Sequence, residues 1–213
     1  MKYWLTFVLS CCLIFGMATI SWASFLFEPE LGLGTLQVED QNYPADQSTQ
    51  MFYVNNNVDI FLVRLGLEAG YANGSSYDFL NLGAGVTLRI PTGGINLLAG
   101  AGYQGFLFYH SSPKFMDSFW GTLLGAGVEI PIIDALSLNA IYYYPVTRKY
   151  YQDLAFISGD CSQVTMEYYK VSLYYNLPLL DIFLNFRGIG AGYKAKAKEY
   201  TSYSCSLGCK IGF

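Results

Sequence analysis

Apolar and polar side chains alternate along several stretches of this chain, and this two-residue period is typical of β-strands with one apolar face. The alternating stretches are 60–71, 78–90, 120–130 and 169–177. From 80 to 90 the even positions carry Leu, Leu, Ala, Val, Leu and Ile, and the odd positions between them carry Asn, Gly, Gly, Thr and Arg. A soluble β-sandwich also alternates, but it seldom places Arg, Glu or Lys in the middle of so many strands. We therefore expect an all-β, antiparallel, transmembrane up-and-down barrel with lipid outside and a polar lumen.

The composition agrees with strands rather than helices as the membrane-spanning elements. Hydrophobic residues make up 53% of the 213 residues and charged residues 13%, with 22 Gly, 19 Tyr and 15 Phe. After the N-terminus, no stretch offers the ~18 consecutive apolar residues that a spanning helix needs. The net charge of −4 excludes a basic surface, so we expect no nucleic-acid partner.

Turn signals divide the chain into strands. Proline ends three strands before tight turns, at Pro91, Pro131 and Pro178, whereas the opposite connections are longer and polar. Eight strands are expected near 60–71, 78–90, 95–109, 119–130, 136–145, 165–177, 182–194 and 203–213. Residues 30–38 and 50–55 can add a hairpin, joined to the next strand by Asn55-Asn56-Asn57. We predict ten strands, with eight strands and an N-terminal extension as the alternative.

The N-terminus is predicted to be an export signal. Lys2 is followed by an apolar run from Tyr3 to Trp22, and Ser21-Trp22-Ala23 places small residues at the −3 and −1 positions of a signal-peptidase site. The expected organisation is a cleaved signal peptide over 1–23 and a single barrel domain over 24–213.

The last strand ends on an aromatic residue. Cys205, Leu207, Cys209, Ile211 and Phe213 share one face of it. This alternation ending in Phe resembles the C-terminal signature of bacterial outer-membrane proteins. The resemblance implies the outer membrane of a Gram-negative bacterium, contact with the barrel-assembly machinery through Phe213, and outer-membrane lipid as surroundings.

One strand breaks the alternation. Asn185 and Arg187 are polar on odd positions, but Gly188, Gly190 and Gly192 follow on even ones. A β-bulge near Arg187-Gly188 would restore the phase. The alternative is a glycine stripe that faces lipid.

Several short motifs over residues 78–213 resemble the YfaZ-type small outer-membrane proteins. They are the Leu-Gly-Ala-Gly strands that run into proline turns (82–91 and 124–131), Tyr-Tyr-Tyr-Pro at 142–145, and Gly-Tyr-Lys at 192–194. The loop with Cys161 and the Lys-Ala-Lys-Ala-Lys tract depart from that family. The resemblance implies the barrel fold and brings no activity.

Seven charged residues are expected to face the lumen: Arg64, Glu68, Arg89, Glu129, Lys170, Arg187 and Lys210. Because unpaired buried charges are costly, we expect them to form an internal network in a filled barrel. This favours a non-enzymatic protein with a structural or surface-interaction role. A narrow, porin-like channel for small solutes or ions, lined by the same residues, is the alternative.

A minor alternative is a lipid A-modifying hydrolase. His110 and Ser112 form a His-x-Ser pair that resembles the catalytic pair of outer-membrane lipid A deacylases, with His as base and Ser as nucleophile. Alternation places His110 on the lumen side, away from lipid, and Pro113 stands where that motif has Asn. We therefore predict no catalytic residues.

The remaining candidate sites lie at the loop ends of the strands. Cys161 and Cys205 are the candidate disulfide. Lys194, Lys196 and Lys198 alternate with alanines, so an extended strand would project all three from one face toward lipopolysaccharide phosphates or the barrel mouth. No metal-ligand spacing or dinucleotide fingerprint is present, and no cofactor is expected.

Overall fold

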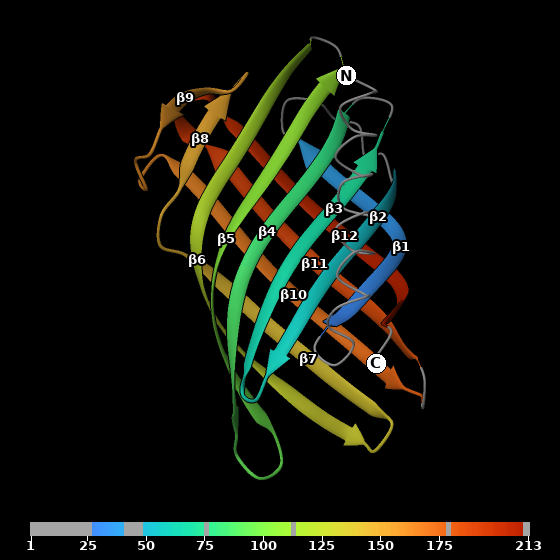
Figure 1. Cartoon of the computed structure of the whole chain (residues 1–213). Helices are drawn as coiled ribbons and strands as arrows, with labels where there is room; N and C mark the ends of the chain where they lie inside the picture. The colour runs from blue at the N-terminus through green and yellow to red at the C-terminus, as the bar shows by residue number, and fades with distance from the viewer. Residues whose placement is uncertain (1–26, 41–48, 75–76, 112–113, 178–179, 211–213) are drawn as a thin grey trace.

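The computed structural model describes residues 27–40, 49–74, 77–111, 114–177 and 180–210. Ten long strands build the wall of a barrel (Figure 1). They are β1 (Phe27–Asp40), β2 (Thr49–Ile60), β3 (Val63–Asn73), β4 (Tyr77–Pro91), β5 (Asn96–Ser111), β6 (Lys114–Ile133), β7 (Leu136–Pro145), β10 (Val164–Asn176), β11 (Asp181–Tyr193) and β12 (Lys198–Lys210). Two short strands, β8 (Lys149–Gln152) and β9 (Ala155–Ser158), form a hairpin between β7 and β10.

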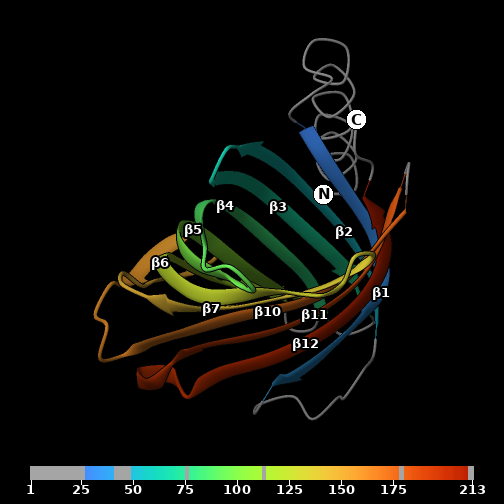
Figure 2. The ribbon, with the colours of Figure 1, turned by 90° about the horizontal axis from the view of Figure 1, so that it is seen from below.

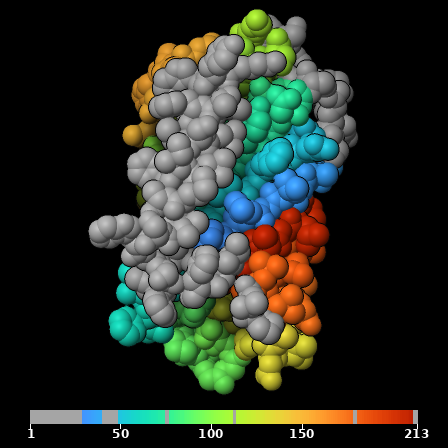
Figure 3. All heavy atoms as spheres, turned by 45° about the vertical axis from the view of Figure 1, so that its right-hand side comes forward, coloured from blue at the N-terminus to red at the C-terminus, as the bar shows by residue number. Residues whose placement is uncertain are grey.

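The barrel is closed, and each strand pairs antiparallel with its neighbours. The seam is the pairing of β1 with β12, whose register runs from Glu30 opposite Lys210 to Asp40 opposite Tyr200. Figure 3 shows the blue N-terminal strand directly beside the red C-terminal one, and Figure 2 shows the strands curving around the lumen. The prediction of ten strands is confirmed, and the alternative of eight is wrong because β1 and β2 belong to the wall.

Side chains alternate between lumen and exterior along the wall. Leu31 and Leu33 on β1 and Leu65 and Leu67 on β3 are exposed on the outside. The exterior is therefore an apolar band suited to lipid. The three tyrosines at 142–144 divide between the faces. Tyr142 and Tyr144 face outward, whereas Tyr143 lies inside and stacks on Tyr168 with ring centroids 5.4 Å apart.

Connections at the two ends of the barrel differ mainly in the long segment between β7 and β10. Two of the connections predicted to be long are short, because β4 begins at Tyr77 soon after β3 ends at Asn73, and β6 begins at Lys114 soon after β5 ends at Ser111. Short turns link β2 to β3, β4 to β5, β6 to β7, and β10 to β11; we call this side the turn end. The opposite side, the loop end, carries the β8–β9 hairpin and the 3₁₀ turn η1 (Lys194–Lys196). Among the described residues, no helix is long and apolar enough to cross a membrane.

The turn between β2 and β3 is not the predicted asparagine triplet. Asn55, Asn56 and Asn57 lie inside β2, and the chain reverses at Phe61 and Leu62. Phe61 adopts a left-handed φ of 54° and is 98% exposed. The asparagines stay in the strand because the side chains of Asn55 and Asn57 face the lumen and donate hydrogen bonds to the buried Glu30 carboxylate.

The predicted bulge in β11 is also absent. β11 pairs in unbroken register from Asp181 to Tyr193 with both neighbours. Arg187 therefore faces inward and Gly188 faces outward, so the glycine stripe that faces lipid is correct. Tyr169, opposite Gly188 on β10, occupies the space that a side chain at 188 would fill. An aromatic ring laid over a strand glycine offsets the missing side chain there.

We predict that Gly188→Val destabilises the barrel by about 1–3 kcal/mol, because the new side chain displaces the Tyr169 ring. Gly190→Val is the matched control, since a Cβ at 190 meets Glu167 at an ordinary 3.6 Å. The urea midpoint of refolded protein, followed by the different gel migration of unboiled and boiled samples, measures both. Equal midpoints for the two variants would contradict the outward orientation of Gly188.

Candidate functional site: the barrel lumen

The loop-end half of the lumen is filled by a packed cluster that we call the aromatic plug. Its members are buried and come from strands all around the wall: Leu36, Val38, Met51, Ala72, Tyr77, Phe79, Phe106, Phe108, Phe119, Leu123, Tyr150, Val164, Met166, Tyr168, Ile189, Ala191 and Tyr200. Phe108 stacks on Tyr200 with ring centroids 4.3 Å apart. The alternation explains the plug, because lumen-facing positions change from polar to apolar toward the loop end of most strands.

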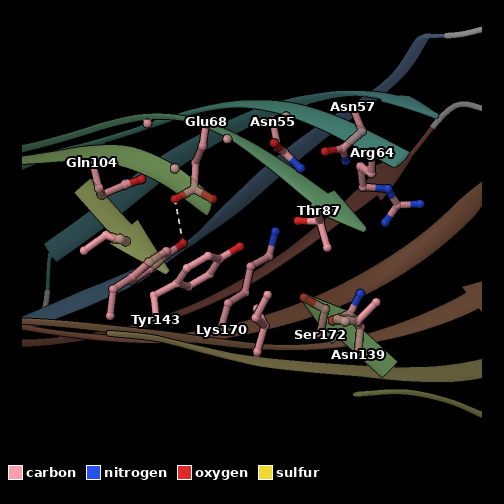
Figure 4. A pocket seen from close by; sticks show the side chains of 18 of the residues that line it. Asn55, Asn57, Arg64, Glu68, Thr87, Gln104, Asn139, Tyr143, Lys170 and Ser172 are labelled. Carbon is pink, nitrogen blue, oxygen red and sulfur yellow. Dashed lines mark hydrogen bonds between the residues drawn. The ribbon is translucent and has the colours of Figure 1, made fainter. Parts of the chain in front are cut away.

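The turn-end half of the lumen holds a polar cavity of about 120 Å³. Figure 4 shows Asn55, Asn57 and Glu68 on one wall of this cavity and Lys170, Ser172 and Asn139 on the wall opposite. Glycines 66, 83, 85 and 102 also line it, and their missing side chains leave the space open. A cavity needs only about 10–15 Å³ per water and a few polar partners, so this one has room for several water molecules.

Glu68 on β3 is the centre of a network that crosses the lumen. Its carboxylate accepts hydrogen bonds from Tyr168 of β10 at 2.7 Å and Asn81 of β4 at 2.9 Å. Arg187 of β11 lies 3.8 Å away, with its guanidinium 3.3 Å from the centroid of the Tyr53 ring. The pair joins opposite parts of the wall, and both charges are compensated.

Arg187 is 1% exposed, and its Nε, Nη1 and Nη2 have no hydrogen-bond acceptor among the residues that the structure describes. The nearby Asn185 amide, on the same face of β11, is also buried without a hydrogen-bond partner among the described residues. The cation is therefore held by the Tyr53 ring and by the field of Glu68 rather than by a bidentate pair.

Glu30 on β1 forms a second network toward the turn end. Asn55 donates to it at 3.0 Å and Asn57 at 3.1 Å, and Tyr174 of β10 donates at 3.1 Å. Lys170 lies 4.0 Å from the same carboxylate and donates to Tyr53 at 3.1 Å, which connects the two networks.

Ion pairs surround the turn-end mouth. Arg64 forms two 2.6 Å bonds with Asp59, and Arg89 pairs with Glu129 at 2.6 Å. Across the lumen, Lys210 lies 3.4 Å from Asp181. The mouth is charged but electrically balanced.

A third network, the loop-end brace, surrounds Asp117 of β6, which is fully buried. Its carboxylate accepts hydrogen bonds from Tyr150 of β8 at 2.6 Å and from Tyr200 of β12. Lys198 of β12 lies 3.1 Å from it, and His110 of β5 contacts the Tyr200 hydroxyl at 3.1 Å. The brace fastens the β8–β9 hairpin to the wall.

The structure places all seven sequence-predicted lumen charges inside the barrel, but in separate groups. Glu68, Lys170 and Arg187 share the centre, Arg64, Arg89 and Glu129 lie at one side of the mouth, and Lys210 lies at the other. Three further acids face the lumen that were not among the predicted lumen residues: Glu30, Asp59 and Asp117. Alternation extended over the full strands contained the signal for all three, since each falls on the lumen side.

His110 is buried against Phe115, with ring centroids 4.1 Å apart, and faces the lumen as alternation predicted. Ser112 and Pro113 lie outside the described residues. Nothing described around His110 gives it access to lipid.

The two cysteines predicted to bond are free thiols in the structure. Cys205 lies on the outward face well inside β12, opposite Phe186 and Thr35, because β12 begins earlier than predicted, at Lys198. Cys161 lies in the connection between β9 and β10. The structure thus differs from the predicted Cys161–Cys205 disulfide.

The three lysines do not share one face of a strand. Lys194 and Lys196 lie in η1 and are exposed, whereas Lys198 points inward to Asp117. The extended conformation was wrong because the chain needs a tight turn between β11 and β12, closed by Ala197 at a left-handed φ of 48°. Contact of Lys194 and Lys196 with anions stays a prediction. The signal segment 1–23 and Phe213 lie outside the described residues.

Comparison with known proteins identifies the fold. The structure is similar to the outer-membrane protease OmpT from Escherichia coli, with a TM-score of 0.61 and 11% identity over 89% of this chain and 97% of that chain. Weaker likenesses are to Neisserial surface protein A (TM-score 0.45, 10% identity, 88% and 97% covered) and to Ail of Yersinia pestis (0.37, 12%, 88% and 100%). No family model and no curated protein matches the sequence, so the YfaZ-type resemblance is not confirmed. The fold is that of small Gram-negative outer-membrane barrels.

We predict that Arg187→Met destabilises the barrel by about 3–5 kcal/mol, because it leaves Glu68 buried without its cation. Adding Glu68→Gln should recover a large part of this loss, since the amide keeps the bonding partners without the charge. The urea midpoint in vesicles measures both. Additive losses in the double variant would contradict a coupled pair.

We predict that Asp117→Asn loosens the β8–β9 hairpin. The change removes the charge that holds Tyr150, Tyr200 and Lys198, so amide hydrogen exchange in β8 should become about tenfold faster, the effect of losing a charge-assisted hydrogen bond. Asp153→Asn is the control, because an amide oxygen at 153 can still accept from the Met116 N–H as Asp153 does. Equal protection of β8 in both variants would contradict the brace.

Proposed function

We propose that this chain is a non-enzymatic, non-conducting outer-membrane barrel that holds a rigid hairpin at the cell surface. Short turns face the periplasm and longer loops face outward in such barrels, so we place the loop end outside the cell. The aromatic plug is the observation that carries the proposal, because a solute that entered from outside would meet packed rings instead of water.

The hairpin supports a role in surface interaction. β8 pairs with the loop-end part of β6, and Tyr150 ties it to the buried Asp117. Leu154 and Phe156 in this hairpin are 78% and 59% exposed. An anchored hairpin with apolar side chains at its tip is suited to contact another surface with little loss of conformational entropy.

A narrow channel is the second candidate, favoured by the polar cavity in the turn-end half. Conduction would require the plug to open. Its rings belong to strands fixed by hydrogen bonds on both sides, so we favour the closed barrel.

We propose no catalysis because the described lumenal acids are engaged in the three networks and in the ion pairs at the mouth, and His110 contacts Tyr200 rather than an activated nucleophile. OmpT is a protease, but at 11% identity the likeness extends to the fold alone and brings no activity to this chain.

We predict that refolded wild-type protein gives no steady conductance in planar bilayers. Phe108→Ala with Phe119→Ala should produce small, frequent openings, because both rings lie in the plug. Leu107→Ala on the outer face of β5 is the control and should stay closed. Steady wild-type conductance would overturn the closed barrel and favour the channel.

A further inference from the structure

A crevice of about 330 Å³ lies on the outer surface of the barrel, under the β8–β9 hairpin. Its lining consists of Tyr103 on β5, Ser118 and Trp120 on β6, Tyr151 on β8, and Leu154 at the tip of the hairpin. In Figure 1 the hairpin lies beside the loop-end part of β6. The crevice is separate from the lumen, because these side chains of β5 and β6 face outward.

The course of three strands creates this crevice. β7 pairs with β6 only as far as Leu123 opposite Pro145. Beyond that point β8 takes its place, with Lys149 opposite Trp120 and Gln152 opposite Asp117. The sheet therefore continues past the end of β7, and the hairpin contributes Tyr151 and Leu154 to the crevice on its outward face.

The floor of the crevice is a stacked pair of aromatic rings. Tyr103 and Trp120 have ring centroids 5.8 Å apart and planes 23° apart. Trp120 lies over Gly105, where a Cβ would collide with its ring. Tyr and Trp at this height of a membrane barrel mark the boundary between hydrocarbon and headgroups, so the crevice opens where lipid chains meet lipid phosphates.

A cation stands next to this apolar floor. Lys149, directly across from Trp120, is exposed and forms no ion pair with any residue that the structure describes. The neighbouring Arg148 is already engaged, since it donates to the carbonyl oxygens of Cys161 and Val164. The site therefore combines apolar and aromatic surface with one free ammonium, which binds phosphate as a flexible point charge.

We propose that this crevice binds a phosphorylated glycolipid of the outer leaflet, lipid A, with an acyl chain against Tyr103, Trp120 and Leu154 and a phosphate on Lys149. Free phosphate would make no contact with the apolar floor, and an uncharged lipid would make no ionic contact with the Lys149 ammonium. The proposal rests on the outer-membrane placement given above and is independent of whether the lumen conducts.

The fluorescence of Trp120 can report binding to the crevice. From residue 24 onward Trp120 is the single tryptophan of the chain, so the emission of protein purified from outer membranes without its signal segment reports on the crevice. Diphosphoryl lipid A is titrated into phosphatidylcholine vesicles that hold the barrel. We expect a saturable shift in Trp120 emission. Lys149→Gln should weaken the apparent affinity about fivefold, the usual effect of one lysine near an anionic lipid.

Three further arms make the test decisive. Lys114→Gln, an exposed lysine at the end of β6 and outside the crevice, should bind as wild type does. Leu154→Ser should weaken binding of both lipid A and its dephosphorylated form, whereas Lys149→Gln should affect the phosphorylated form alone. Inorganic phosphate without lipid A should leave the emission unchanged.

The proposal is overturned if Lys149→Gln and wild type bind lipid A equally, or if inorganic phosphate alone reproduces the shift. Planar-bilayer conductance of the same preparation separates this result from a failure of the closed-barrel proposal, because lipid binding at the crevice does not depend on the plug.

Discussion

Pairing of β1 with β12 is the constraint on which the rest of this structure depends. In lipid, an unpaired strand edge would leave a row of amides and carbonyls without partners, so a spanning sheet has to close on itself. Closure after ten strands fixes a lumen slightly wider than side chains fill in an eight-stranded barrel. The interior must then be filled by large rings, bridged by ion-pair networks or left partly open as a cavity, and this protein uses all three.

Rings, ion pairs and cavity occupy different levels of the lumen along the barrel axis. Toward the loop end, Phe106, Phe108 and Phe119 fill the lumen with packed rings. At the centre, Glu68 and Arg187 connect opposite walls. Toward the turn end, Gly66, Gly83 and Gly85 leave the cavity that carboxylates and amides line. Packed apolar rings lower the local dielectric constant and so strengthen the electrostatic interactions next to them, and the plug therefore also contributes to the stability of the Glu68–Arg187 pair.

Alternation predicted the class of fold and the side on which most of the lumen charges lie. The first two of the ten strands were predicted instead from a possible N-terminal hairpin. It gave wrong local predictions where the same residues are compatible with two backbone conformations. The asparagine triplet has turn-like composition, and only the position of Glu30 across the strand pair explains why Asn55 and Asn57 stay inside β2. The glycines of β11 suggested a bulge. In the structure the ring of Tyr169 on the neighbouring strand covers the outward-facing Gly188 and fills the space of the missing side chain. The brace at Asp117 depends on residues from β5, β6, β8 and β12, a spatial grouping that no spacing along one strand reveals.

The uneven filling of the lumen also determines where an electric field acts. Charged and polar side chains line the turn-end half and can respond to a field, whereas the packed rings of the plug cannot, so a voltage difference across the membrane falls more steeply over the plug than over the cavity. The plug is therefore the least polarisable layer inside this barrel. The charges of the brace, Lys198 and Asp117, lie within that layer, and they experience a steeper potential gradient than the ion pairs at the opposite mouth.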